Sequence, residues 1–204
     1  MADENGWVVF AQVASPIVAL ALGVVGVWNE KIKNWLFGPK LELELHEPEG
    51  HLTHKMDGEV RRYYLVKVKN ASRRDTAHNV RLRLVELWSI DKSGNKENCS
   101  PSMPLQLLLS GSGAESNTDI TTYDCYNIGF MGEYNEGCFT IQDAWDLFSF
   151  AKQIEPHDTV KIGLEIQADN LTHSKTKYLN LTWQDNERSP DSPWSSIPVL
   201  SLAD

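Results

Sequence analysis

Residues 7–28 form one uninterrupted, mostly apolar run with a tryptophan, Trp7 and Trp28, at each end. The run contains no charged residue, and Gln12 and Ser15 are its only clearly polar side chains. An α-helix of this length extends roughly 33 Å, enough to cross a hydrocarbon core about 30 Å thick. Tryptophans at both ends suit the two lipid–water interfaces. The pattern therefore predicts a single transmembrane helix over residues 7–28.

After residue 40 the pattern changes, and apolar residues alternate with polar ones. Successive side chains of a β-strand point to opposite faces, so this alternation predicts strands with one face on a core. Stretches rich in Asn, Asp, Gly and Pro separate them and predict turns. The alternating segments are 41–45, 64–69, 80–85, 160–167 and 178–183, with 103–109 and 120–126 as less regular candidates.

The predicted organisation is one all-β domain behind one membrane helix. About seven strands fit a two-sheet antiparallel sandwich, which we place over residues 40–185. Leu87 follows Val85 out of phase with the preceding alternation, which predicts a β-bulge or a bend. The remaining parts are a short N-terminal segment 1–6, a juxtamembrane linker 29–39 and a Pro- and Ser-containing tail 186–204. We expect the tail to form an edge strand, with an extended partner-binding tail as the alternative.

Two of the strand sequences carry a resemblance. Tyr-Leu-Val-Lys-Val-Lys-Asn-Ala at 64–71 and Ala-His-Asn-Val-Arg-Leu-Arg-Leu at 77–84 resemble adjacent strands of immunoglobulin-like adhesion modules. Similar patterns occur in small single-pass bacterial membrane proteins of unknown role, and residues 154–166 are similar to the penultimate strand of such domains. The resemblance implies an immunoglobulin-like sandwich and a non-catalytic role, without a specific ligand.

The formal net charge of −9 argues against nucleic acid as a partner, because phosphate binding needs a basic surface. Residues 55–96 are the exception, with eleven Lys and Arg against five Asp and Glu. If the two strands within this segment pair, their outward cations share one face, with two more in the intervening turn. This candidate basic surface consists of Lys67, Lys69, Arg73, Arg74, Arg81 and Arg83.

The basic surface has two interpretations. It would bind anionic lipid head groups, since the linker is short, or an acidic partner protein. Alternatively, Lys67 and Lys69 pair with Glu42 and Glu44 on a neighbouring strand and have only a structural role.

The distribution of lysines predicts the membrane orientation. Lys31, Lys33 and Lys40 follow the helix, and no Lys or Arg precedes it, so the positive-inside rule places the sandwich in the cytoplasm. The odd number of cysteines agrees with a reducing compartment. Four N-x-S/T triplets point the other way, toward an extracytoplasmic domain; they begin at Asn70, Asn98, Asn170 and Asn180.

Small residues recur every fourth position along the predicted helix. Such a stripe lets a second helix approach closely, which predicts either a membrane-protein partner or a homo-oligomer. The stripe consists of Ala11, Ser15, Ala19 and Gly23.

The candidates for metal binding and catalysis are few. His46, His51 and His54 lie among carboxylates with a spacing that could hold a transition metal, but Pro and Gly indicate a solvated loop, and we expect no metal site. Cys125 and Cys138 flank a Gly-containing loop and could approach each other, although inert thiols are expected. No catalytic or cofactor motif is present, so we expect neither an enzyme nor a cofactor.

The sequence thus favours a membrane-anchored, non-enzymatic binding or assembly subunit that acts through its sandwich and its helix. One alternative is a ligand-sensing effector that oligomerises through the helix and perturbs the membrane. A further alternative is an extracytoplasmic envelope adhesion module, which Asn-linked glycans or a Cys125–Cys138 disulfide would favour.

Overall fold

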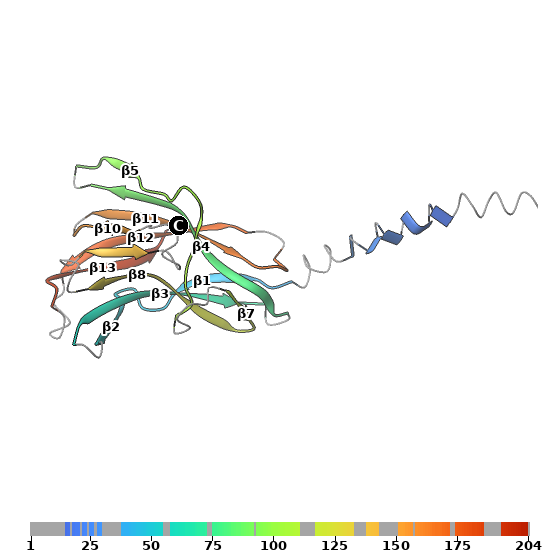
Figure 1. Ribbon diagram of the computed structural model, residues 1–204, viewed down its shortest axis with the longest axis horizontal. Helices are drawn as coiled ribbons and strands as arrows, with labels where there is room; N and C mark the ends of the chain where they lie inside the picture. The colour runs from blue at the N-terminus through green and yellow to red at the C-terminus, as the bar shows by residue number, and fades with distance from the viewer. Residues whose placement is uncertain are drawn as a thin grey trace, which may run out of the picture.

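The computed structural model describes most of the chain from residue 38 onward and parts of the segment before it (Figure 1). The described residues are 15–16, 18–20, 22–23, 25–26, 28–29, 38–54, 58–72, 75–91, 93–110, 117–132, 138–142, 151–156, 158–171, 174–185 and 193–203.

Within these residues the chain folds into two antiparallel sheets that face each other, which confirms the predicted all-β sandwich. Sheet A has the strand order β1-β3-β8-β9-β10, with β2 also paired to β3. Sheet B has the order β13-β12-β11-β4-β5, with β6 and β7 also paired to β4. The strands are β1 (Leu41–Leu45), β2 (His51–His54), β3 (Val60–Asn70), β4 (Ala77–Ile90), β5 (Lys96–Asn98), β6 (Leu105–Gln106), β7 (Asn117–Ile120), β8 (Tyr123–Gly132), β9 (Phe139–Gln142), β10 (Ala151–Ile154), β11 (Thr159–Gln167), β12 (Thr176–Asp185) and β13 (Ser196–Leu202).

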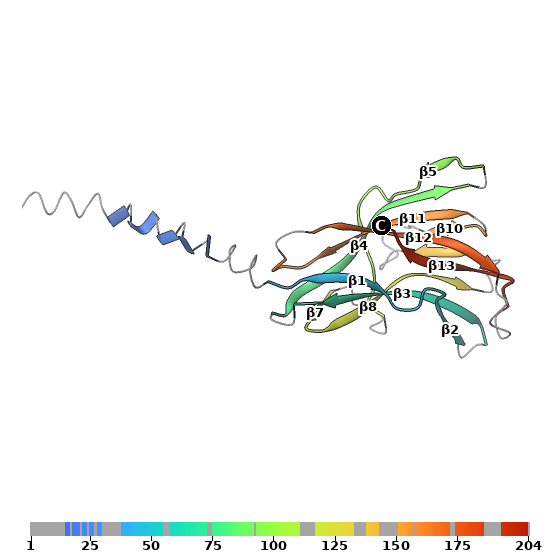
Figure 2. The same cartoon turned by 180° about the vertical axis from the view of Figure 1, so that it is seen from behind.

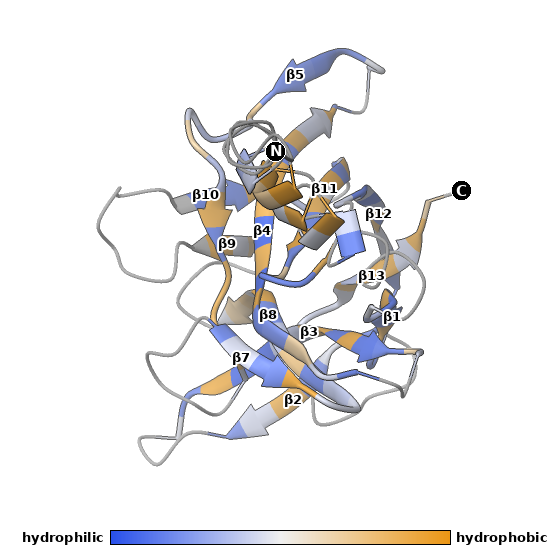
Figure 3. Cartoon of the chain, turned by 90° about the vertical axis from the view of Figure 1, so that its right-hand side faces the viewer, coloured by the Kyte–Doolittle hydropathy of each residue, from blue (hydrophilic) through white to orange (hydrophobic). Residues whose placement is uncertain are grey.

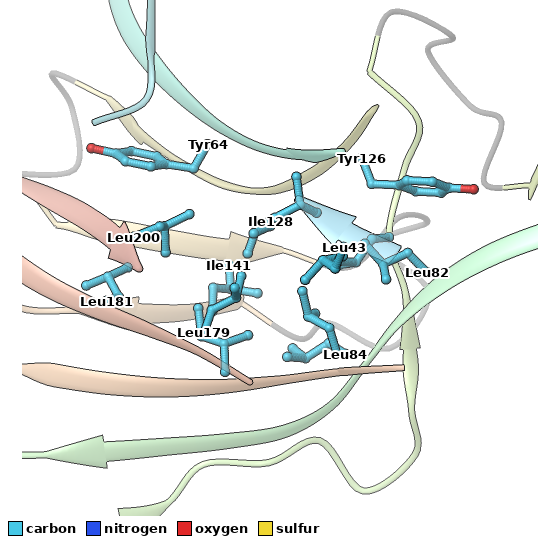
Figure 4. Packing of buried hydrophobic residues seen from close by; sticks show 14 of the residues in the cluster. Leu43, Tyr64, Leu82, Leu84, Tyr126, Ile128, Ile141, Leu179, Leu181 and Leu200 are labelled. Carbon is cyan, nitrogen blue, oxygen red and sulfur yellow. The ribbon is translucent and has the colours of Figure 1, made fainter. Parts of the chain in front are cut away.

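The core lies between the sheets and is filled by the apolar members of the alternating segments (Figure 4). Val66 and Val68 of sheet A and Leu82 and Leu84 of sheet B are all fully buried. Tyr126 also points inward, and its hydroxyl donates to the Val80 carbonyl oxygen at 2.9 Å, linking the two sheets. The hydroxyl is thereby satisfied inside an otherwise apolar core.

The predicted bulge is present in β4. Leu84 pairs with Leu164 and Glu86 pairs with Gly163, so Val85 is the extra residue. The insertion restores an inward orientation to Leu87, which is fully buried.

Both open sides of the sandwich are partly closed. Residues 105–110 pass from sheet B to sheet A: the Leu107 amide donates to Leu82 of β4 at 2.9 Å, and the Ser110 amide donates to Cys125 of β8 at 2.8 Å. On the opposite side, the Leu200 amide of β13 donates to the Pro48 carbonyl oxygen at 2.9 Å. Strand β13 confirms the edge strand expected in the tail.

The described part of residues 15–29 is helical (Figure 3) and extends away from the sandwich (Figures 1 and 2). Leu20 and Leu22 are 72% and 67% exposed there. Among the described residues, no helix is long and apolar enough to cross a membrane. Much of the predicted span 7–28, including residues 7–14, lies outside the described residues.

Candidate functional site

One end of the sandwich, which we call the tether-side pole, carries the point where the N-terminal segment joins β1 (Figures 1 and 2). The Ala71 amide donates to the Lys40 carbonyl oxygen at 2.8 Å, so the end of β3 secures the entry into β1. Asn70 organises the β3–β4 turn: its side-chain amide donates to the carbonyl oxygens of Asp75 at 2.7 Å and Ile120 at 3.2 Å. The Asn70 side chain is almost completely buried, so it is a structural part of the pole.

A polar network extends from this turn across the pole. Asn79 has a positive φ of 52°, a conformation that Asn tolerates better than most residues, and it lies at a register shift between β4 and β7. The Asn79 backbone amide donates to Asp119 Oδ1 at 2.8 Å, and the Asn79 side-chain amide donates to Asp169 Oδ1 at 3.2 Å. His78 Nδ1 lies 3.1 Å from Asp119 Oδ2. Groups from β7 and from the β11–β12 turn therefore converge on Asn79 of β4.

Asp119 is electrostatically favoured in its charged form. The hydrogen bond from the Asn79 backbone amide lowers the Asp119 pKa most, and the contact with His78 lowers it further. Both act because they stabilise the carboxylate more than the protonated acid.

The β11–β12 turn is fastened to the β3–β4 turn by Asn170. Its side-chain amide donates to the Thr76 carbonyl oxygen at 2.9 Å, and its Oδ1 accepts from the His78 backbone amide at 3.0 Å. Asn70 and Asn170 each begin an N-x-S/T triplet, and both use their amide nitrogens within the fold. Attachment of a glycan at Asn70 would break buried hydrogen bonds. The triplet at Asn70 therefore does not support an extracytoplasmic location.

An open cleft of about 260 Å³ lies beside this network, on the outer side of sheet B. Arg81 contributes a guanidinium whose Nε is buried and has no hydrogen-bond partner among the described residues. The neighbouring Arg83 is engaged, since its Nη1 donates to Gln167 Oε1 at 3.1 Å. The cleft is lined by Asn79, Arg81, Gln167, Ala168, Asp169, Leu171 and Ser174.

The predicted basic surface is not one surface. Strands β3 and β4 lie in different sheets and do not pair, so the condition for a shared face is not met. Lys67 and Lys69 lie on the outer face of sheet A, and Arg81 and Arg83 lie on that of sheet B. A turn between two alternating strands can close a hairpin or cross between sheets, and the alternation is the same in both cases. Arg73 and Arg74, in the turn, lie outside the described residues.

The alternative interpretation, in which Lys67 and Lys69 pair with glutamates of the neighbouring strand, holds for Lys69 only. Lys69 Nζ lies 2.9 Å from Glu44 Oε1, in the register where Glu44 and Glu42 face β3. Lys67 instead lies over the Tyr123 ring, with its Nζ 4.5 Å from the ring centroid.

Strands β3 and β8 together form an aromatic and cationic stripe on the outer face of sheet A. Tyr63 and Phe130 are cross-strand partners with ring centroids 6.1 Å apart, and the Arg61 guanidinium carbon lies 5.1 Å from the Phe130 centroid. With Lys67 and Tyr123 these residues define the β3–β8 stripe. The sequence alone did not reveal it, because Phe130 and Tyr123 come from a strand whose alternation is irregular.

The histidine and cysteine candidates are not assembled into sites. His51 and His54 are three residues apart on β2 and so point to opposite faces, while His51 Nδ1 lies 3.3 Å from Glu47. In the described part of the chain, no group of three His, Cys, Asp or Glu side chains could hold a metal ion.

Cys125 and Cys138 do not approach each other, contrary to one sequence-based possibility. Cys138 precedes Phe139, which pairs with Met131, six residues along β8 from Cys125. That offset corresponds to roughly 20 Å along a strand, whereas a disulfide needs Cα atoms within about 7 Å. Neither cysteine forms a disulfide, and burial raises the Cys125 pKa, which makes that thiol a poor nucleophile.

Of the small-residue stripe, Ser15, Ala19 and Gly23 lie in described helical positions and are exposed, and Ala11 lies outside the described residues. A Cβ atom added at Gly23 would meet no other atom within 4 Å. This side of the helix is therefore open to a neighbour.

No protein-family model and no curated protein sequence matches this chain. The residues at the tether-side pole and in the β3–β8 stripe thus provide the basis for assigning a function.

Proposed function

We propose that this protein is a single-pass, membrane-anchored binding and assembly subunit without enzymatic activity. In this proposal, the helix over residues 7–28 lies in the bilayer, and the sandwich is held at the cytoplasmic surface. The main observation behind the proposal is that large apolar side chains are exposed along the helix, while the neighbouring β-domain already has a complete core.

The exposed leucines need an apolar environment that the sandwich does not provide. Leu20 and Leu22 project from a helix that extends away from the β-domain. Burying a leucine side chain contributes about 1.5–3 kcal/mol, so a run of such residues strongly favours transfer into lipid. Trp7 and Trp28 then lie at the two interfaces.

The linker keeps the tether-side pole close to that membrane. Residues 29–39 extend at most about 40 Å even when fully stretched. Lys31, Lys33 and Lys40 support the cytoplasmic orientation through the positive-inside rule. The pole therefore faces lipid, and the rest of the sandwich is available to proteins.

We further infer an immunoglobulin-like topology for the sandwich. Strands β1, β3 and β8 correspond in order to A, B and E of such domains, and β4, β11 and β12 correspond to C, F and G. The segment 108–110, which pairs with β8, takes the place of strand D. Strands β9, β10 and β13 are then additions to that plan.

The β3–β8 stripe is the surface we assign to partner binding. Tyr63 and Phe130 supply large rigid contact area, and Arg61 adds a charged group with apolar methylenes. Aromatic and arginine side chains of this kind dominate the binding energy of protein interfaces.

The anchor is tested by fractionation of cells that express the full chain. We expect the wild type to stay in membranes after an alkaline wash. In the double variant Leu20→Arg and Leu22→Arg it should be released, because each charge costs about 2.5–3.5 kcal/mol within a membrane helix. Leu202→Arg, at an exposed position of β13, is the matched control and should remain bound. Release of the wild type by the wash would refute the anchor.

The assembly role is tested by purifying the full chain in mild detergent and identifying co-purified proteins by mass spectrometry. A stoichiometric partner that is lost in Phe130→Ala but retained in Leu202→Ala supports the proposal. Recovery of a pure homo-oligomer, abolished by Gly23→Leu, would favour the oligomerising effector instead. A monomer without a partner would contradict both functions.

A further inference from the structure

The open cleft at the tether-side pole is formed where the β11–β12 turn borders the outer face of sheet B. Arg81 belongs to β4 and pairs with Gln167 of β11 and Asn117 of β7, so three strands fix its backbone. Leu171 and Ala168 contribute apolar walls. The rigid backbone around Arg81 makes this a preorganised site.

Arg81 differs from its neighbouring cations in lacking a partner. No carboxylate of the described residues forms an ion pair with it, and its Nε is buried without an acceptor. By contrast, the neighbouring Arg83 donates to Gln167 Oε1 at 3.1 Å. The terminal Nη1 and Nη2 atoms of Arg81 also donate to no acceptor among the described residues, and unlike Nε they are not buried. A phosphate or carboxylate group could accept two parallel hydrogen bonds from this end of the guanidinium.

A second charge lies in the same cleft. The Asp169 carboxylate is exposed and is held by the Asn79 side-chain amide, with its two oxygens 3.2 and 3.3 Å from Asn79 Nδ2. A purely anionic ligand would be repelled by this group. A ligand with a phosphate and an ammonium group instead meets one complementary charge at Arg81 and another at Asp169.

We propose that the cleft binds a zwitterionic phosphate ester of the ethanolamine-phosphate type, with phosphate oxygens accepting from Arg81 and the ammonium donating to Asp169. The cleft lies at the pole where the N-terminal segment enters the sandwich, so a phospholipid head group is the source of this ester. That last step rests on the proposed membrane anchor, whereas recognition by the cleft does not.

The chemistry is tested with the full chain in a phosphate-free, nonionic detergent. Glycerophosphoethanolamine and inorganic phosphate are titrated separately while the amide signals of Ala168 and Leu171 are followed by nuclear magnetic resonance. We expect both probes to shift these signals, with tighter binding of glycerophosphoethanolamine. Arg81→Gln should weaken its binding at least about tenfold, the effect of losing hydrogen bonds to a charged group. Lys161→Gln, on the same side of sheet B but outside the cleft lining, should change it less than about twofold.

Two further variants separate the contributions of the charges. Arg81→Lys keeps the charge but loses the planar donor pair, so intermediate binding is expected. Asp169→Asn should weaken the binding of glycerophosphoethanolamine without weakening the binding of inorganic phosphate. Equal losses in Arg81→Gln and Lys161→Gln, or no shift with either probe, would overturn the site.

The lipid source is tested by inserting the full chain into nanodiscs and comparing phosphatidylethanolamine with a phosphate-free galactolipid. A shift of the Arg81 Nε–H signal only in phosphatidylethanolamine supports the head group as ligand. Binding of the soluble ester without such a shift would overturn the lipid source. If the chain failed to enter nanodiscs, the anchor would be refuted, while the detergent titration would still decide whether the cleft recognises the ester.

Discussion

The helix and the sandwich use the same residue type in opposite ways. In the sandwich, Leu84 is fully enclosed between the two sheets, whereas in the helix Leu20 is 72% exposed. The sandwich gains its apolar environment from its own chain by packing two sheets face to face, with distant segments such as β4 and β11 paired within them. The helix extends away from that core, so it must obtain its environment from another medium or another molecule. Exposure of leucine therefore distinguishes the sandwich, which encloses its own apolar side chains, from the helix, for which we propose a lipid or protein environment.

The sharpest test of this difference is to truncate one leucine in each region. We expect Leu84→Ala to lower the free energy of unfolding by about 2–5 kcal/mol, since it leaves a cavity between the sheets. Leu20→Ala should leave the unfolding of the sandwich unchanged. Urea denaturation of the full chain in detergent, followed by tryptophan fluorescence, measures both. A comparable loss in Leu20→Ala would show that the helix is part of the folding unit.

The pole that joins the two regions depends on polar rather than apolar contacts. Asn70→Ala removes the buried amide that donates to Asp75 and Ile120. We expect the free energy of unfolding to fall by about 1–3 kcal/mol, because the two carbonyl groups lose their hydrogen-bond donor and stay desolvated. Asn95→Ala is the matched control: its amide donates to Asp91 in an exposed turn, and its loss should cost less than about 1 kcal/mol. Urea denaturation measures both variants. Equal losses of unfolding free energy would mean that water reaches the carbonyl groups at the pole.

The sandwich could be predicted from the sequence because alternation directly reports which face of a strand is buried. Even the bulge at Val85 follows from the changed phase of Leu87. The pairing of β3 could not be predicted, since alternation says nothing about the neighbour of a strand, and the supposed basic surface failed for this reason. Short strands such as β6 and β9 contain too few residues to establish a period.

The polar network at the tether-side pole could likewise not be predicted from the sequence pattern. Asn79 of β4, Asp119 of β7 and Asp169 after β11 are far apart in the chain, and they meet because β7 and β11 both pair with β4. A possible signal was the occurrence of Asn and Asp within turn segments, since these residues accept backbone hydrogen bonds and tolerate positive φ. That signal indicates turns but not which of them converge.

A smaller effect at the pole depends on pH. The Asn79 amide, followed by His78, lowers the Asp119 pKa, so the folded state favours the carboxylate. The resulting contribution to folding stability is fully present above the ordinary Asp pKa of about 3.9, and it is lost as the pH falls through the lowered pKa. We therefore expect Asp119→Asn to be less stable than the wild type at pH 7, with the difference shrinking at pH 3. A difference that grows on acidification would contradict this sign.

The smallest expected effect concerns the exposed ion pair between Lys69 and Glu44. Both side chains are about two-fifths exposed, at 42% and 41%, so water screens their attraction. A double-mutant cycle with Lys69→Ala and Glu44→Ala should give a coupling of about 0.2–1 kcal/mol that decreases with added salt. A larger, salt-independent coupling would mean that this edge of sheet A is covered by another molecule. In that case the sandwich would also have a partner, as we propose for the helix.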